Sequence, residues 1–222
     1  MNTRTFLDLI GNLNFNEKGD IRMFGNDILF LQRFLKGPGY YQGELDGLYG
    51  PLTDAALNRF EEETDKIANQ HGRFDLRSEK NVTTLHPSAQ VSARQFFAKV
   101  LNSSDLASNG VIAKIISGTR TYSEQAELYA QGRTKPGRIV TNASAGRSNH
   151  NFGIAWDVGL FKGFDYLEES PLYDVIGTIG KNLGLEWGGD WSSLIDKPHF
   201  QLKVGLTLAE VRAKFESGLA YA

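Results

Sequence analysis

The order in which helix and strand patterns follow one another most constrains the fold of this 222-residue chain. In the second half they run as a helix at 91–101, a strand at 110–116, a helix at 121–132, a strand at 155–160, a helix at 173–183, a strand at 199–202 and a helix from 208. Because helices and strands do not alternate regularly, this order favours the α+β class over a doubly wound sheet. We expect a central antiparallel sheet flanked by helices.

The first third of the chain has a different pattern, two helices joined by a glycine-rich turn. Ile28, Leu31 and Leu35 fall on one helical stripe, which Gly37 ends. Pro51 opens the second helix. Residues 63–89 are charged and polar and show no sustained periodicity. The expected organisation is therefore a helical module over 1–62, a linker over 63–89 with some helix at its start, and a larger domain over 90–222.

Composition and charge exclude several classes of protein. The 24 basic and 26 acidic residues leave a formal charge of −2, so no strong positive field exists to hold a nucleic acid. No cysteine is present, which excludes disulfides and thiolate ligands and leaves any metal to His, Asp or Glu. Apolar residues make up 41% of the chain and charged residues 23%, as in soluble folded proteins.

Neither an export signal nor a membrane helix is expected. Asp8 and Asn12 interrupt the apolar patch near the N-terminus, whereas an export signal needs about 7–15 unbroken apolar residues. No stretch approaches the roughly 20 apolar residues of a membrane helix. We therefore expect synthesis in the cytoplasm and no integral membrane segment.

Two of the four histidines have a carboxylate close by in the sequence, and these are candidate metal ligands. His150 precedes Asp157, and Asp196 comes shortly before His199. Zinc catalysis uses three nitrogen or oxygen ligands from the protein and leaves one position for water. His150, Asp157 and His199 can supply that set. Gly153 would turn the chain into a strand that carries Asp157. A proline before His199 disfavours a helix there, which leaves Asp196 in a turn beside the metal.

Five separated segments of the second half resemble one family of zinc metallopeptidases. They are Ser117–Tyr122, Tyr129–Thr134, His150–Asp157, Trp187–Trp191 and Asp196–Gln201. The family comprises cell-wall hydrolases: vancomycin-resistance dipeptidases, D-alanyl-D-alanine carboxypeptidases, and phage and bacterial L-alanyl-D-glutamate endopeptidases. The resemblance identifies residues 90–222 as a zinc peptidase catalytic domain.

This resemblance implies a role for each matched residue. It implies Zn²⁺ bound by His150, Asp157 and His199. It also implies a general base at Asp196 and, at Arg120, a cation that stabilises the oxyanion, roles that agree with the chemistry of zinc-activated water. The expected substrate-binding residues are Ser148, Gln125 and Trp191.

The glycine-rich turn of the first third resembles the helical peptidoglycan-binding module that is often fused to wall hydrolases. The most specific part of the resemblance is the Asp-Gly-x-Tyr-Gly-Pro-x-Thr run from Asp46. Similar modules lack catalytic groups, so the resemblance implies targeting to bacterial peptidoglycan. The expected wall-binding residues are Tyr41, Asp46 and Tyr49.

Two short motifs bear on which bond is cut. This chain has His-Asn-Phe-Gly at His150 and Asp-x-x-His at Asp196, whereas the carboxypeptidase branch usually has His-Gln-Thr-Gly and Glu-x-x-His. Cleavage of the L-alanyl-D-glutamate bond is therefore the preferred prediction. The alternatives are a D,D- or L,D-carboxypeptidase that trims stem peptides, and a non-catalytic wall-binding protein. The intact ligand set argues against the last.

The biological setting stays open at this point. A phage endolysin released by a holin, an effector delivered by a contractile secretion system and a housekeeping enzyme all fit the sequence. In each setting we expect a monomer that acts on the cell wall, in the periplasm or outside the cell. An effector would have an immunity protein as a further partner.

Overall fold

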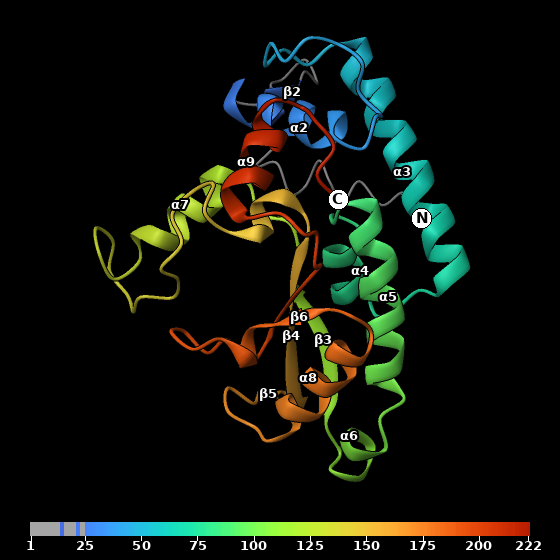
Figure 1. Ribbon diagram of the computed structural model, residues 1–222, viewed down its shortest axis with the longest axis vertical. Helices are drawn as coiled ribbons and strands as arrows, with labels where there is room; N and C mark the ends of the chain where they lie inside the picture. The colour runs from blue at the N-terminus through green and yellow to red at the C-terminus, as the bar shows by residue number, and fades with distance from the viewer. Residues whose placement is uncertain (1–13, 16–20, 23–24) are drawn as a thin grey trace. The chain divides into compact units, whose positions relative to one another are not determined.

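The computed structural model describes residues 14–15, 21–22 and 25–222, with side chains from residue 27 onward. The N-terminal stretch in which we expect no export signal lies largely outside the described residues. No helix in the described part is long and apolar enough to cross a membrane. The chain forms two compact units (Figure 1). The first comprises Met1–Glu63, Arg120–Phe152 and Gly205–Ala222, and the second comprises Thr64–Thr119 and Gly153–Val204.

Helices dominate the first unit, and aromatic side chains pack between them. Its elements are β1 (Asn14–Phe15), β2 (Ile21–Arg22), α2 (Gly25–Lys36), the start of α3 (Pro51–His71), α7 (Tyr122–Ala130), η1 (Asn149–Phe152) and α9 (Leu208–Glu216). Phe30 of α2 packs against Tyr122 and Phe215, at ring-centroid distances of 5.6 and 5.3 Å. The Tyr221 hydroxyl donates to the Phe152 carbonyl at 2.9 Å. The C-terminal residues therefore support the turn η1.

Several helix ends lie where the sequence signals predict them. Helix α2 ends at Lys36, directly before Gly37, and α3 begins at Pro51. Thr121 and Thr207 each form a capping box with the glutamate three residues later. These local signals act through backbone groups at the helix ends, which explains why the sequence alone locates them.

Gln32 organises the glycine-rich turn between α2 and α3. Its side chain is buried, and its Oε1 accepts from the Gly47 N–H at 2.9 Å. Its Nε2 donates to Asp46 Oδ1 at 2.7 Å and to the Tyr41 hydroxyl at 3.1 Å. Gly47 has φ of +70°, a conformation that favours glycine. A buried amide and one glycine thus give the turn its shape.

The second unit is an antiparallel sheet covered by helices, which confirms the predicted α+β class. Its strands are β3 (Ile112–Ser117), β4 (Ala155–Lys162), β5 (Asp165–Tyr166), β6 (Glu186–Trp187) and β7 (His199–Gln201), in the order β3-β4-β7-β6 with β5 paired to β4. Its helices are α4 (Leu76–Val82), α5 (Pro87–Leu101), α6 (Ser104–Ser108) and α8 (Leu172–Asn182), with the 3₁₀ turn η2 (Gly188–Asp190).

The core of the second unit lies between the sheet and the helices α5 and α8 (Figure 1). Phe96 of α5 packs against Trp156 of β4 and Phe200 of β7, at ring-centroid distances of 6.3 and 4.4 Å. Successive side chains of a strand point to opposite faces. The residues that flank Trp156 and Phe200 in sequence therefore lie on the other face of the sheet.

The segment 63–89, predicted as a linker, is largely helical. It contains the end of α3, all of α4 and the start of α5, and its residues Val82 and Leu85 are fully buried in the core. Helix α5 begins at Pro87, four residues before the predicted start. The end of α3 and α4 bury only a few apolar side chains, Ile67, Ala68 and Val82, and this number is too small for a helical period to be recognised. The division of the chain at 62 and 89 differs from the two compact units and stays a prediction.

His86 caps α5 and should make stability depend on pH. Its Nδ1 accepts from the Ser88 N–H at 3.3 Å, and burial lowers the pKa of its imidazole to about 4. Below about pH 6.5 the unfolded chain takes up a proton that the folded chain does not, so stability should fall by about 3 kcal/mol as the pH drops to about 4. We expect the urea midpoint of the wild type to fall more between pH 7 and pH 4 than that of His86→Gln. Equal losses in the two proteins would contradict this assignment.

Candidate metal centre

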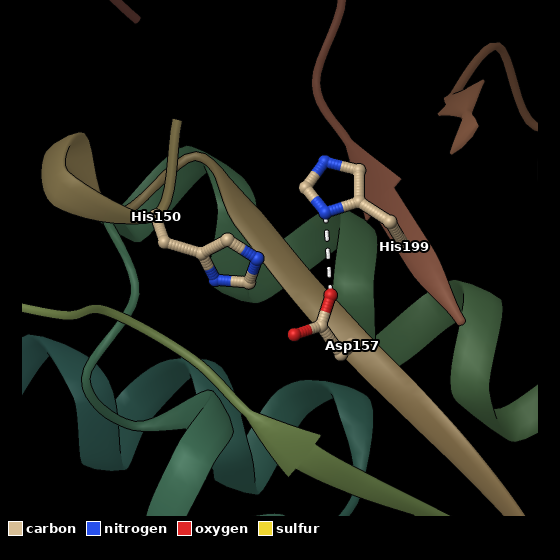
Figure 2. Close-up of side chains that lie close together, drawn as sticks. All are labelled: His150, Asp157 and His199. Carbon is tan, nitrogen blue, oxygen red and sulfur yellow. Dashed lines mark hydrogen bonds and ion pairs between the residues drawn. The ribbon is translucent and has the colours of Figure 1, made fainter. Parts of the chain in front are cut away.

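Strands β4 and β7 bring an aspartate and a histidine together. Asp157 and His199 are directly opposite in the antiparallel register, so their side chains share one face of the sheet. His199 Nδ1 lies 3.2 Å from Asp157 Oδ1 (Figure 2). Trp156 and Phe200, also opposite each other, fill the core on the other face. A slip of one residue would exchange the two faces, so the hydrophobic core fixes the pairing of Asp157 with His199.

His150 lies on the 3₁₀ turn η1, just before β4. Its carbonyl accepts from the Arg120 N–H at 3.0 Å, and its side chain is only 2% exposed. The next side chain, Asn151, donates to the Arg120 carbonyl at 2.9 Å and accepts from the Gly146 N–H at 3.0 Å. Gly153 follows with φ of +67°, so the predicted turn between His150 and the strand is confirmed.

His150, Asp157 and His199 form a group that could hold a metal ion (Figure 2). Each offers one ligand atom, and these atoms lie within 4.8 Å of one another. Two ligands of one tetrahedral zinc, each bound at about 2.0–2.1 Å, would lie roughly 3.3 Å apart. The 3.2 Å between His199 Nδ1 and Asp157 Oδ1 fits that spacing. Two imidazoles and one carboxylate are a donor set that suits zinc and leaves a position for water.

The charge state of His199 reflects its surroundings. Burial by itself would lower the pKa of the imidazole, but the hydrogen bond and the negative charge of Asp157, with a smaller contribution from Gln201, outweigh it and raise the pKa. A metal ion and a proton would therefore compete for Nδ1.

The turn before His199 holds Asp196 by its backbone. Asp196 donates its N–H to the Gly188 carbonyl at 3.0 Å, and its own carbonyl accepts from the His199 N–H at 3.1 Å. The predicted turn from Asp196 to His199 is therefore confirmed. A Cβ on Gly188 would lie 2.4 Å from the Asp196 carbonyl oxygen, so only glycine permits this close approach. The negative charge of Asp196 also contributes to the raised pKa of His199.

Comparison with known proteins adds a family to this geometry. Residues 141–202, which include all three candidate ligands, match the M15 peptidase family model described as D-alanyl-D-alanine carboxypeptidase. The chain is 36% identical over 142 residues to the peptidoglycan L-alanyl-D-glutamate endopeptidase CwlK of Bacillus subtilis (strain 168), and the match covers 60% of this chain and 81% of CwlK. This chain belongs to the M15 peptidase family. Residues 24–64 match a peptidoglycan-binding domain. The resemblances inferred from the sequence are thereby confirmed.

Two further relatives of this M15 peptidase have related names. The L-alanyl-D-glutamate peptidase of Listeria phage A118 is 34% identical over 128 residues, which are 56% of this chain and 40% of the phage protein. The crystal structure of the L-Ala D-Glu endopeptidase ChiX of Serratia marcescens is matched at 26% identity and a TM-score of 0.43, over 62% of this chain and 94% of ChiX.

Gln125 of this M15 peptidase holds Arg120. The Gln125 side chain is fully buried, and its Oε1 accepts from Arg120 Nη1 at 3.1 Å. Its Nε2 donates to the Ala143 carbonyl at 2.7 Å. Gln125 therefore connects Arg120 to the loop after α7. The oxyanion role of Arg120 and the substrate roles of Gln125 and Ser148 stay predictions. Ser148 accepts through its carbonyl from the Asn151 N–H at 2.9 Å.

The three tryptophans have different places in the second unit. Trp191 is half-buried and lies against His199, with the ring centroids 4.8 Å apart, and its Nε1 donates to Glu186 Oε1 at 3.4 Å. Trp156 and Trp187 are buried in the core. Trp191 thus contacts the candidate metal centre, and its predicted contact with substrate stays a prediction.

The predicted wall-binding residues lie at the glycine-rich turn of the first unit. Tyr41 is only 4% exposed and its hydroxyl donates to the Glu44 carbonyl at 2.7 Å, so it stabilises the turn from inside. Asp46 is exposed and accepts from the Leu48 N–H at 2.9 Å. The Tyr49 hydroxyl donates to Asp54 Oδ1 at 3.0 Å. Their contact with wall material stays a prediction, and the burial of Tyr41 argues against a direct contact there.

Three residues to which the sequence assigned no role of their own contact the candidate ligands or the segments that carry them. Asn151 joins η1 to the Arg120 carbonyl, Gly188 accepts from the Asp196 N–H, and Gln201 contacts His199. Gln201 could have been found, because residues two apart on a strand share a face and Gln201 follows His199 by two. Asn151 and Gly188 act on segments distant in sequence, and no local pattern reports such contacts.

Proposed function

We propose that this chain is a zinc-dependent peptidase that cleaves the L-alanyl-D-glutamate bond in the stem peptides of bacterial peptidoglycan. The observation that carries the proposal is the convergence of His150, Asp157 and His199 within 4.8 Å. The similarity to CwlK, a protein named for this activity, supports the choice of bond.

Each proposed role follows from the chemistry of the side chain. His150, Asp157 and His199 would hold the zinc ion, which when bound polarises a carbonyl and lowers the pKa of water. The Asp196 carboxylate would accept the proton of the attacking water and pass it to the leaving amine. The Arg120 guanidinium would donate hydrogen bonds to the carbonyl oxygen as it gains negative charge, a contact that strengthens toward the transition state.

Products of wall digestion test the choice of bond. With purified peptidoglycan fragments and zinc, we expect mass spectrometry to find released peptides that begin with D-glutamate and no accumulation of free alanine. A D,D- or L,D-carboxypeptidase would instead remove residues from the carboxyl end of the stem and release free alanine. His150→Ala serves as the inactive control. Free alanine as the main product would contradict the endopeptidase proposal and favour the carboxypeptidase.

We further propose that the helical module binds peptidoglycan through the exposed side of its glycine-rich turn. Leu48 at this turn is 69% exposed, between Asp46 and Tyr49. In a His150→Ala background that prevents digestion, Leu48→Asp should reduce binding to insoluble peptidoglycan by about tenfold in a pelleting assay, since the buried apolar contact is lost. Leu76→Asp is the matched control, because Leu76 lies on α4 of the other unit and is 86% exposed. Equal losses in both variants would contradict the proposal.

We further propose that the protein acts on the bacterial cell wall, in the periplasm or outside the cell. The phage relative favours an endolysin that reaches the wall after a holin opens the membrane. Delivery by a contractile secretion system, with an immunity protein as partner, is the second candidate. Lysis genes or secretion genes beside the coding sequence would distinguish the two settings. We also propose a monomer, which sedimentation can check.

A further inference from the structure

Gln201 contacts His199 on the side of the ring opposite Asp157. The two residues lie on β7 with Phe200 between them, so their side chains share the face of the sheet that carries Asp157. Gln201 is 8% exposed, and its Oε1 lies 2.9 Å from His199 Nε2. Its cross-strand partner is Ala155, a small side chain that leaves room for the amide.

The two neighbours of His199 favour different tautomers of its ring. A neutral imidazole has one N–H and one lone pair. Asp157 Oδ1, 3.2 Å from Nδ1, favours a proton on Nδ1, which would block a metal at that nitrogen. Gln201 Oε1 favours a proton on Nε2, which leaves the Nδ1 lone pair directed at the carboxylate oxygen. A cation at Nδ1 would replace the proton there and keep the hydrogen bond to Gln201.

Trp191 restricts the orientation of the same ring. Its indole lies 4.8 Å from the imidazole centroid at an interplanar angle of 46°. Rotation of the imidazole by half a turn would move Nδ1 away from Asp157 and Nε2 away from Gln201. Packing against the indole opposes that rotation, so the hydrogen bond of Gln201 acts on a ring that is already oriented.

We propose that Gln201 is a positioning residue that keeps the proton of His199 on Nε2 and so makes Nδ1 the metal-binding nitrogen. The inference rests on the proposed function, because it needs a metal at His150, Asp157 and His199. The physical basis of the proposal is general. When one ring nitrogen of a histidine binds a metal, the other ring nitrogen usually donates a hydrogen bond that orients the ring. Loss of that hydrogen bond typically lowers metal affinity about 10–100-fold.

The test uses the full chain and measures zinc affinity by competition with a chromophoric chelator. Gln201→Leu removes the acceptor at similar size and should bind zinc about 10–100-fold more weakly than the wild type. Gln201→Glu keeps an acceptor and should bind zinc at least as tightly as the wild type. Thermal unfolding of each metal-free protein separates a loss of affinity from a loss of folding. Nitrogen-15 NMR of the zinc-loaded wild type should show metal at His199 Nδ1 and a proton on Nε2.

The outcomes separate this inference from the proposed function. Zinc bound by the wild type but with unchanged affinity in Gln201→Leu would overturn the inference alone, as would zinc bound through Nε2. A fall of affinity in Gln201→Glu as large as that in Gln201→Leu would also overturn it. A wild type that binds no zinc would overturn the proposed function and, with it, the role of Gln201.

Discussion

Asp196→Asn should lower the turnover of peptidoglycan by about 10²–10⁴-fold, the usual contribution of general acid–base catalysis, while the zinc content stays that of the wild type. Asparagine keeps the size and polarity of the side chain but cannot accept the proton of the attacking water. The backbone hydrogen bonds of Asp196 to Gly188 and His199 do not involve the side chain, so the turn should persist. Turnover and metal content, measured on the same preparation, check this expectation.

Asp190→Asn is the matched control for this change. Asp190 lies close by in the sequence, but its exposed carboxylate pairs with Lys181 at 3.1 Å, so its loss should leave turnover close to that of the wild type. If Asp196→Asn loses zinc together with activity, Asp196 is a metal ligand. If Asp196→Asn stays active and Asp190→Asn does not, the base is Asp190 and the assignment to Asp196 is wrong.

His150→Ala should lose zinc and, with it, all measurable peptidase activity. Loss of a residue that only orients a ligand typically weakens metal binding about 10–100-fold. Removal of one of the three ligands themselves should weaken it by more than that. His150 is almost fully buried, and its backbone is held by Arg120, so the fold around η1 should survive the loss of the ring. Metal analysis of the dialysed protein, together with circular dichroism, checks both statements.

His71→Ala provides the control for an ordinary histidine, because His71 ends α3 and does not belong to the metal-binding group. It should bind one zinc per chain and digest peptidoglycan like the wild type. Equal zinc contents in His150→Ala and His71→Ala would contradict the ligand assignment.

The sequence predicted the turns beside the candidate ligands because these turns depend on local geometry. Gly153 has the positive φ that a turn between His150 and β4 requires, and the turn from Asp196 to His199 follows from the proline before the histidine. The amount of helix within residues 63–89 was harder to predict. Residues 63–89 are mostly polar. Their buried apolar side chains are divided among separate helices and turns, with too few in each to show a helical period: Ile67, Ala68, Val82, Leu85 and Ala89.

The sequence by itself determined the α+β class, the end of α2 and the starts of α3, α7 and α9, because capping side chains, glycine, proline and apolar spacing act within a few residues of the chain. It also singled out His150, Asp157 and His199 as candidate ligands. Only the tertiary structure decided how these residues meet. Asp157 pairs with His199 because Trp156 and Phe200 pack against α5 and so fix the strand register. The hydrogen-bond partners of three further side chains also form only in the folded units: those of Gln201, Asn151 and Gln125. Packing and hydrogen bonds between distant segments select these partners, and no local pattern in the chain encodes them.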